Sequence, residues 1–256
     1  HRIDLGVGGT IEWPKPISDS AARDRYYIHS LIEESITSSQ LEGASTTRLV
    51  AKELLRSGRK PQDRSEQMIL NNFRTMREIA NWKQEELSPE LLLEMHRLVT
   101  ADTLDDPTGV GRLRRADEHI VVSDAEGTIY HTPSPAAQLE ERLTLLCEIA
   151  NNRIPRKFLH PVIRAIILHF GLAYDHPFVD GNGRTARALF YWSILRQGYS
   201  LFEFLSISHI ILKAPAKYAR AFLYTETDDN DLTYFILYHL DIIERAVNHL
   251  NQYVKD

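Results

Sequence analysis

The chain of 256 residues contains a single cysteine, Cys147, so no disulfide can form within it. The residues around Cys147 are mostly apolar, which predicts a buried structural thiol rather than a nucleophile. The chain also lacks an excess of basic residues, with a net charge of -5 and an isoelectric point near 6.1. Nucleic-acid-binding domains rely on a positively charged surface, so we expect no DNA or RNA partner for this segment.

Long apolar runs are missing as well. No stretch approaches the roughly twenty apolar residues that a membrane-spanning helix needs, and no signal peptide is visible. We therefore expect a cytoplasmic protein with no membrane partner. The hydrophobic content of 43% allows a sizeable core in one or two domains.

Helix signals follow one another through most of the chain, and the sequence contains no internal repeat. Apart from two helices on either side of residues 176–181, the expected helices span residues 18–41, 46–57, 63–82, 89–101, 135–151, 215–226 and 231–255. The one convincing β signal is a pair of β-prone runs, 119–122 and 128–131, separated by turn-like residues. The sequence therefore predicts an all-α fold with one short β-hairpin.

Residues 176–187 read His-Pro-Phe-Val-Asp-Gly-Asn-Gly-Arg-Thr-Ala-Arg and combine several residue types that act on phosphates. His176 follows an apolar helical pattern. Because it precedes proline, we expect it to end the helix in an extended conformation. Its imidazole, with an ordinary pKa of roughly 6.5, can accept a proton at neutral pH. Asp180 is a hard oxygen ligand that can hold Mg²⁺ against phosphate groups.

A second helix begins within this stretch, with Asn182 as its expected N-cap. Unpaired N–H groups at a helix N-terminus attract phosphate oxygens, and Gly181 and Gly183 allow those oxygens to approach closely. Arg184 and Arg187 share a helix face, where their guanidinium groups match phosphate geometry. Taken singly, each feature is more typical of an ordinary turn, a satisfied histidine or a solvated surface, but their combination predicts phosphoryl or nucleotidyl transfer.

The same stretch resembles the signature of Fic domains, His-x-Phe-x-(Asp/Glu)-Gly-Asn-Gly-Arg-x-x-Arg, and matches it at every fixed position. The resemblance implies a Fic-fold helical bundle and a nucleotidyltransferase that moves AMP from ATP to a Ser, Thr or Tyr hydroxyl of a target protein (AMPylation). Related phosphorylating toxins of the Doc type carry lysine at the position of Gly183. The glycine therefore favours nucleotidyl transfer over kinase activity.

Carried over to this chain, the resemblance makes His176 the base that deprotonates the target hydroxyl and Asp180 the ligand of Mg²⁺. It makes residues 181–183 the anion hole for the α- and β-phosphates of ATP. It also implies that Arg184 binds the β- or γ-phosphate and that Arg187 binds the γ-phosphate.

Far upstream, residues 38–43 read Ser-Ser-Gln-Leu-Glu-Gly and fit the inhibitory pattern of many Fic proteins, (Ser/Thr)-x-x-x-Glu-(Gly/Asn). A Glu-Gly pair is also common at the end of a helix, where the glycine alone explains the stop. In the family this pattern lies on a helix packed over the active site. We therefore expect Glu42 to pair with Arg187, which would remove a γ-phosphate ligand and leave bound ATP with a misaligned α-phosphate.

The resemblance carries further expectations. The hairpin at about residues 119–131 corresponds to a flap that docks the target protein by strand addition. Tyr218 follows Lys217 at the place where family members put an aromatic residue against the adenosine, although a tyrosine on an amphipathic helix is equally typical of a core. Phe178 should be buried and hold the loop. Fic proteins often form homodimers, and the sequence does not fix the oligomeric state.

The chain divides into three expected parts. Residues 1–16, with several glycines and prolines, predict an irregular N-terminal arm. Residues 17–105 form a helical subdomain that carries the inhibitory helix, and residues 106–256 form the Fic catalytic core. Because the inhibitory helix must contact the catalytic loop, we do not expect these last two parts to fold separately.

Two other functions stay open. The main reaction could be the removal of AMP, with Glu42 positioning a water molecule, or the chain could be a nucleotide-sensing regulatory module without chemistry. The intact His176 and Asp180 argue against a pure sensor, which would need neither a base nor a metal ligand. Transfer of UMP, GMP or phosphocholine is open too, because the residues that select the base cannot be assigned.

Overall fold

The computed structural model describes residues 20–123, 126–154 and 158–255, so the expected arm at residues 1–16 lies outside the described residues. Within them the chain is helical apart from one two-stranded antiparallel sheet, as predicted. The α-helices are α2 (Ser20–Leu41), α3 (Arg48–Ser57), α4 (Arg64–Trp82), α5 (Pro89–Thr100), α6 (Leu139–Ala150), α7 (Pro161–Asp175), α8 (Asn182–Arg196), α9 (Ile207–Leu212), α10 (Pro215–Thr227) and α11 (Thr233–Lys255). The strands are β1 (Val122–Ser123) and β2 (Ile129–His131), and short 3₁₀ helices are η2 (Pro107–Gly109), η3 (Ala136–Gln138) and η4 (Ser200–Phe204).

Several helices begin where the sequence signals place them. The side chains of Thr47, Asp63 and Ser88 accept hydrogen bonds from backbone N–H groups in the first turns of α3, α4 and α5. Pro89 occupies the first turn of α5, where its missing N–H is not needed. Gly58 ends α3 in the left-handed conformation, at φ 68°.

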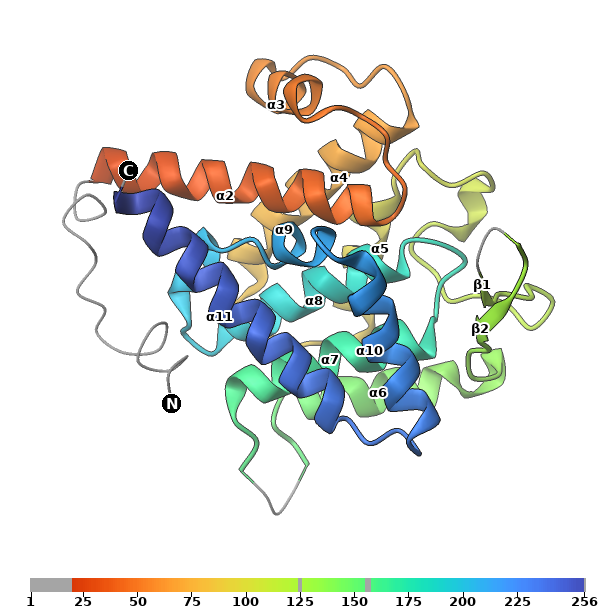
Figure 1. Cartoon of the computed structure of the whole chain (residues 1–256). Helices are drawn as coiled ribbons and strands as arrows, with labels where there is room; N and C mark the ends of the chain where they lie inside the picture. The colour runs from red at the N-terminus through yellow and green to blue at the C-terminus, as the bar shows by residue number, and fades with distance from the viewer. Residues whose placement is uncertain (1–19, 124–125, 155–157, 256) are drawn as a thin grey trace.

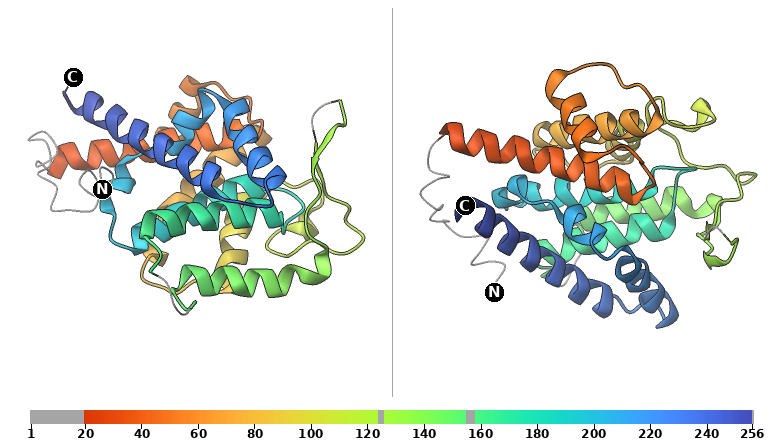
Figure 2. Two further views of the ribbon diagram at one scale, coloured as in Figure 1. Left: turned by 60° about the horizontal axis from the view of Figure 1, so that its bottom comes forward. Right: turned by 45° about the horizontal axis from the view of Figure 1, so that its top comes forward.

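The centre of the molecule is the pair α7 and α8, which make the most extensive helix–helix contact. Nearly every side chain of α8 is buried, including Leu189, Phe190 and Trp192 at 0% exposed. A helix buried on all sides needs no polar face, and α8 accordingly has apolar residues around its whole circumference. Figures 1 and 2 show the remaining helices arranged around this pair. The loop between α7 and α8 thus joins two largely buried helices of the core.

Helix α2 lies across one side of this core and packs on α4, α9 and α8 (Figures 1 and 2). Its start lies beside the end of α11, where the rings of Tyr26 and Tyr253 meet edge to face at 5.5 Å. Its other end, at Leu41, reaches the loop between α7 and α8. One hydrophobic cluster joins α5 to α7 and α8, so the N-terminal helices share a core with this central pair.

The region between α8 and α10 holds helices that the sequence pattern did not predict. Here η4 and α9 bury Phe202, Ile207 and Ile211 against the core. With 5 and 6 residues, these helices are too short to show a clear helical period in the sequence. Cys147 is buried in α6 as expected, and burial raises the pKa of its thiol to about 11, so it is a poor nucleophile at neutral pH.

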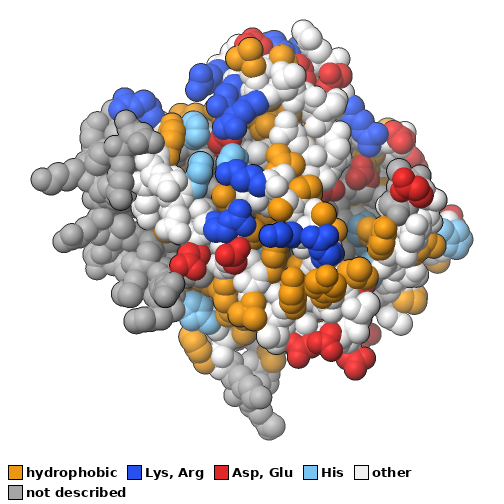
Figure 3. All heavy atoms as spheres, viewed as in Figure 1, with side chains coloured by type: hydrophobic (Ala, Val, Ile, Leu, Met, Phe, Trp, Pro, Cys, Tyr) orange, Lys and Arg blue, Asp and Glu red, His pale blue; other side chains and the backbone are white. Residues whose placement is uncertain are grey.

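The surface is mixed in character. On the face that Figure 3 shows, basic side chains over the middle lie among hydrophobic ones, and acidic side chains border them. None of the helices in the described part of the chain is both long and apolar enough to cross a lipid bilayer.

Candidate active site

Helix α7 ends at Asp175, and His176 follows it in the left-handed region at φ 45° and ψ 56°. The expectation of an extended His176 was therefore wrong. Its N–H donates to Leu172 O at 3.0 Å and closes the last turn of α7, while its carbonyl accepts from Arg114 Nε at 2.9 Å. These bonds stabilise a backbone conformation that costs about 1–3 kcal/mol for a residue other than glycine. The result is that the imidazole projects from the helix end.

The ring of His176 is oriented for proton acceptance. Nδ1 lies 3.3 Å from the carbonyl oxygen of Ala173, which can only accept, so Nδ1 carries the proton and Nε2 offers a lone pair. Burial lowers the pKa of His176, an effect that the hydrogen bond to Ala173 and the charge of Glu42 oppose without cancelling. The imidazole is therefore neutral at pH 7.

His176 faces a cavity of about 290 Å³. The lining comes from the loop between α7 and α8 with the first turn of α8, from the residue that follows α2, and from the segment before β1: Glu42, His119, Ile120, Val121, His176, Val179, Asp180, Gly181, Asn182 and Gly183. The structure thus brings together the predicted base, metal ligand, anion hole and inhibitory residue around one space. Arg184 and Arg187 lie behind the same loop on α8.

The loop itself is fixed by Asn182, which does not act as the expected N-cap. Gly181, at φ 80°, precedes the helix, and Asn182 is the first helical residue. Its amide accepts from Phe178 N at 3.0 Å and donates to Phe178 O at 2.9 Å. This reciprocal pair closes the loop, an arrangement that local capping rules do not predict. Phe178 is 0% exposed, as expected for a structural residue.

Gly183 lies in the first turn of α8, where backbone N–H groups have no partner within the helix. A Cβ added at Gly183 would overlap Glu42 Oε1, so the glycine leaves room for a carboxylate oxygen against the backbone. The same position can therefore accept an oxygen of another anion.

Glu42 pairs with Arg187 as the sequence predicted. The Oε1 atom lies 2.8 Å from Arg187 Nη2, and the Arg187 side chain is 1% exposed against 28% for Glu42. Arg187 also donates from Nε to Ser38 Oγ and from Nη2 to Ser38 O, both at 2.8 Å. The first residue of the inhibitory pattern thus holds the arginine alongside the glutamate, a contact that sequence reasoning did not assign to Ser38.

Arg184 is 0% exposed and donates from Nη1 to Val99 O at 2.9 Å. Its Nε and Nη2 have no hydrogen-bond partner, and the same holds for Nη1 of Arg187. Buried guanidinium donors without partners are costly. Two such groups beside one helix N-terminus indicate a site built for an anion with several oxygens.

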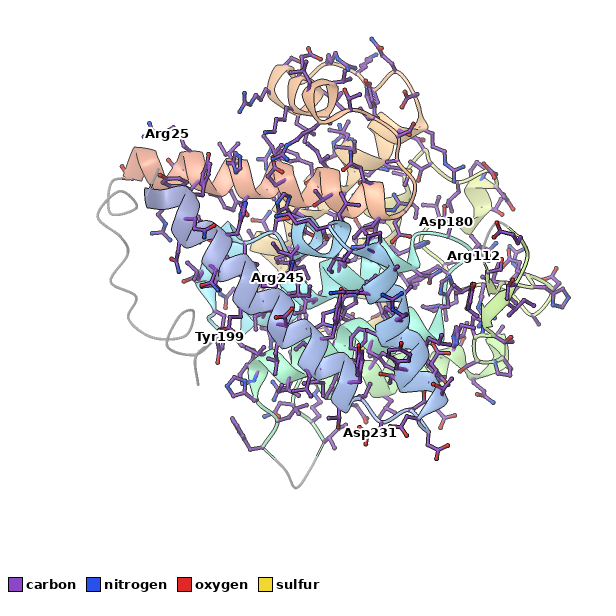
Figure 4. All side chains as sticks on the ribbon, viewed as in Figure 1. Arg25, Arg112, Asp180, Tyr199, Asp231 and Arg245 are labelled. Carbon is purple, nitrogen blue, oxygen red and sulfur yellow. The ribbon has the colours of Figure 1, made fainter. Side chains whose placement is uncertain are left out.

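Asp180 lies at the edge of the cavity, on the side of the hairpin (Figure 4). Its Oδ1 accepts from Gly181 N at 2.5 Å, and its Oδ2 lies 3.2 Å from Arg64 Nη2. The carboxylate is 42% exposed and so remains accessible to a cation. The contact from Arg64 was not anticipated, because nothing in the sequence connects α4 to this loop.

Tyr218 lies on α10, outside the lining of the cavity at His176. Its hydroxyl is 2.8 Å from His169 Nε2, and its ring is partly buried against the core. Burial raises the pKa of this phenol to about 12. Contact of Tyr218 with an adenosine stays a prediction.

The predicted hairpin is confirmed, although its first strand is shorter than expected and shifted to Val122–Ser123. His131 at the end of β2 bonds Tyr174 O at 2.6 Å and Glu226 Oε2 at 2.7 Å, which ties the hairpin to α7 and α10. Ile129 and Tyr130 are more than half exposed. The hairpin therefore presents accessible strand residues close to the cavity.

His96 is a site residue that the sequence analysis missed. It lies on α5, is 0% exposed, and its Nε2 is 2.9 Å from Asp180 O. Burial lowers its pKa to about 4. The residue follows apolar positions on an amphipathic helix, so its sequence context indicates a core position and gives no signal of a contact with the loop.

Residues 86–194 match the Fic/DOC family model. This segment, which is less than half of the chain, is similar to Fic domains. Among curated proteins, protein adenylyltransferase Fic of Nematostella vectensis is 27% identical over 180 residues, which cover 70% of this chain and 40% of that protein. Protein adenylyltransferase fic-1 of Caenorhabditis elegans is 33% identical over 117 residues, covering 46% of this chain and 21% of that protein. The chain thus spans less than half the length of these relatives.

Solved Fic structures share the fold. A Fic family protein from Desulfovibrio desulfuricans superposes with a TM-score of 0.79 at 22% identity, covering 94% of this chain and 71% of that one. A variant of Fic-1 from C. elegans gives a TM-score of 0.72 at 23% identity, covering 93% and 66%. The likeness extends well beyond the residues that match the family model, and confirms the predicted Fic fold.

Proposed function

We propose that this Fic domain belongs to a protein adenylyltransferase that transfers AMP from ATP to a Ser, Thr or Tyr hydroxyl of a target protein, and that Glu42 keeps it inactive. The observation that carries the proposal is the carboxylate of Glu42 held between Arg187 and the backbone at Gly183. An anion of the chain itself lies where a helix N-terminus and a buried guanidinium converge. The names of the relatives, both adenylyltransferases, support the reaction.

In the proposed reaction the hydroxyl oxygen of the target attacks the α-phosphorus of ATP. Its proton passes to Nε2 of His176, the ring nitrogen that the bond to Ala173 leaves unprotonated. The bond from the α-phosphorus to the oxygen shared with the β-phosphate breaks, and pyrophosphate leaves. AMP remains on the target oxygen. The cavity at His176 supplies the space in which these groups align.

The phosphates would bind the N-terminal turn of α8. Backbone N–H groups at residues 181–183 would donate to the α- and β-phosphates. Arg184 has two nitrogens without partners that can donate to the β- or γ-phosphate, and Arg187 would bind the γ-phosphate once it is released from Glu42. Gly183 admits an oxygen where a side chain would block it, which supports nucleotidyl transfer over the kinase geometry.

The residues present fit Mg²⁺. The ion commonly takes one or two carboxylates together with substrate phosphates and water, and Asp180 offers an accessible carboxylate at the cavity. Bound there, the ion would supply positive charge that offsets the charge of the phosphates. Asp180 Oδ1 is already oriented by Gly181 N, which leaves Oδ2 as the atom that would have to exchange Arg64 for the metal.

We propose further that the hairpin docks the target protein. Residues 119–121 line the cavity with His176, and the strand residues that follow are exposed. An extended target segment that pairs with this strand would bring its hydroxyl toward the imidazole. Main-chain pairing would fix the position of the segment, so the side chains of the flap need not select one target sequence.

The proposal is tested by incubating wild type, Glu42→Gly and Glu42→Gly/His176→Ala with Mg²⁺ and ATP, followed by intact-protein mass spectrometry. We expect an AMP-sized adduct that rises in Glu42→Gly and disappears in the double variant. ATP labelled on either the α- or the γ-phosphate separates adenylylation from phosphorylation. Lack of any adduct in Glu42→Gly, under conditions in which ATP binds, would contradict the proposal.

Removal of AMP is a second candidate, favoured by one observation. The Glu42 carboxylate is 28% exposed and lines the same cavity as His176, so it can orient a water molecule there. Adduct prepared with Glu42→Gly is isolated and incubated with wild type and with Glu42→Gln. If wild type removes AMP from the adduct and Glu42→Gln does not, removal of AMP is favoured as the main reaction. A nucleotide sensor would instead leave His176→Ala with a wild-type phenotype.

A further inference from the structure

The imidazole of His96 lies between two segments that are distant in sequence, the loop before the flap and the catalytic loop. The residue lies near the end of α5 and is fully buried. On one side it meets Gly111, which leads toward the hairpin, and on the other it meets Asp180. Figure 4 shows Asp180 and Arg112 on this same side of the molecule.

Both ring nitrogens of His96 are engaged, and the partners define the tautomer. Gly111 N–H donates to Nδ1 at 3.1 Å, so Nδ1 must be an acceptor without a proton. Nε2, 2.9 Å from the carbonyl oxygen of Asp180, must then carry the proton and donate it. The neutral Nε2–H form is the one form of the ring that satisfies both bonds.

The face of the ring holds a second position of the same loop. His96 and Phe178 stack with centroids 3.8 Å apart and planes inclined by 5°. A Cβ added at Gly181 would lie 2.5 Å from Thr100 Cγ2 and 3.6 Å from the His96 ring, so α5 also presses on the turn that begins α8. Residues 178, 180 and 181 are thus all fixed from α5.

We propose that His96 is a positioning residue of the adenylyltransferase site. Its Nε2–H holds the Asp180 carbonyl, and this bond sets the direction in which the carboxylate of the same residue points. Its Nδ1 holds Gly111, so the ring links the origin of the flap to the metal-binding carboxylate and to the start of the anion hole. The inference rests on the proposed function and names a residue that acts through Asp180 rather than on ATP.

Two conservative substitutions separate the two hydrogen bonds. In His96→Asn the amide oxygen can replace Nδ1 and keep the bond from Gly111, but nothing reaches Asp180. In His96→Gln the amide nitrogen can replace Nε2 and keep the bond to Asp180. Made in the Glu42→Gly background, the Asn variant should need about tenfold more Mg²⁺ for half-maximal ATP binding, because one buried hydrogen bond is lost. The Gln variant should stay within about twofold of its parent.

Calorimetric titration at several Mg²⁺ concentrations measures this requirement without turnover when the nucleotide is an ATP analogue with a methylene group between the α- and β-phosphates, which cannot transfer AMP. His209→Asn, the same change at a partly buried histidine on α9, is the control and should leave the Mg²⁺ requirement unchanged. Thermal melting of each variant reports folding. An equal effect of Asn and Gln, or an unchanged Mg²⁺ requirement in a folded Asn variant, would overturn the proposal.

Nitrogen-15 NMR of the wild-type imidazole provides a test that needs no variant. We expect His96 to show a protonated Nε2 and an unprotonated Nδ1. The opposite tautomer, or a doubly protonated ring at pH 7, would contradict the assignment. If Glu42→Gly forms no adduct, the proposed function fails, whereas the NMR and Mg²⁺ titration results still decide the role of His96.

Discussion

Glu34 lies on α2 and Glu42 directly follows the last residue of that helix, and the two carboxylates have opposite surroundings. Glu34 is 2% exposed, and its carboxylate accepts hydrogen bonds from Tyr191 OH at 3.0 Å and Ser206 Oγ at 2.8 Å. It also accepts from Ser208 N at 3.0 Å and Ser208 Oγ at 2.5 Å. These donors come from α8 and from the start of α9, so Glu34 fastens α2 to both helices.

Glu42, directly after the last residue of α2, has one ion pair and faces an open cavity. Removing it would leave Arg187 with its bonds to Ser38 and with a space that an anion can enter. The comparison separates two roles on one helix: Glu34 fixes where the helix lies, and Glu42 is a ligand that the helix presents. A carboxylate that regulates a site has to give way to an incoming anion. A carboxylate that anchors a helix has to stay in place.

The same substitution at the two glutamates should change the stability of the folded protein by different amounts. Glu34→Gln removes the charge and places amide hydrogens against buried donors, so we expect the free energy of unfolding to fall by about 3 kcal/mol. Glu42→Gln should lower it by less, about 1 kcal/mol, because Glu42 is partly solvated and the buried Arg187 keeps its bonds to Ser38. Urea denaturation of both variants measures the difference. Equal losses would mean that Glu42 is a structural residue as well.

A smaller effect is expected at Asp180. Its partner Arg64 is 52% exposed, so Arg64→Ala should alter stability by less than about 1 kcal/mol. Because a cation next to the carboxylate is removed, the Mg²⁺ concentration for half-maximal ATP binding should fall about twofold. Arg56→Ala, at an exposed position on α3, is the matched control. A rise in the Mg²⁺ requirement would show that Arg64 assists the metal site rather than competing with the metal.

The smallest predicted effect is on the titration of His176. Burial lowers its pKa, and the negative charge of Glu42 raises it in part. Glu42→Gly should therefore lower the pKa of His176 further below 6.5, the ordinary value, whereas Glu34→Gln should leave it close to wild type. In the proposed mechanism the neutral imidazole is the base, so activity of Glu42→Gly should be constant above pH 6.5 and fall only at lower pH. NMR titration of the ring measures this pKa. A higher pKa of His176 in Glu42→Gly than in wild type would contradict the prediction.

The sequence predicted the parts of the site that depend on residue type. The Fic signature specified His176, Asp180 and the glycines, and the inhibitory pattern specified the pairing of Glu42 with Arg187, which the structure shows at 2.8 Å. Helix boundaries were close wherever a capping residue marked them. Such signals are local, so they can be recognised in a single sequence.

Contacts between segments that are distant in the chain could not be predicted from the sequence. His96, Glu34 and Arg64 are ordinary residues on amphipathic helices, and only the packing of α2, α4 and α5 against the α7–α8 loop gives them a role. The left-handed His176 had the same origin, because bonds from Arg114 outweighed the local preference before proline. Tertiary contacts decided each of these cases.

The most direct test of the account compares ATP with ADP in calorimetric titrations of wild type and Glu42→Gly. If Glu42 occupies the place of the γ-phosphate at Arg187, wild type should bind the two nucleotides with similar affinity. Glu42→Gly should then bind ATP about tenfold more tightly than ADP, because it gains a charge-assisted bond to the γ-phosphate. An unchanged ratio of ATP to ADP affinity in the two proteins would contradict the claim that Glu42 holds the phosphate site.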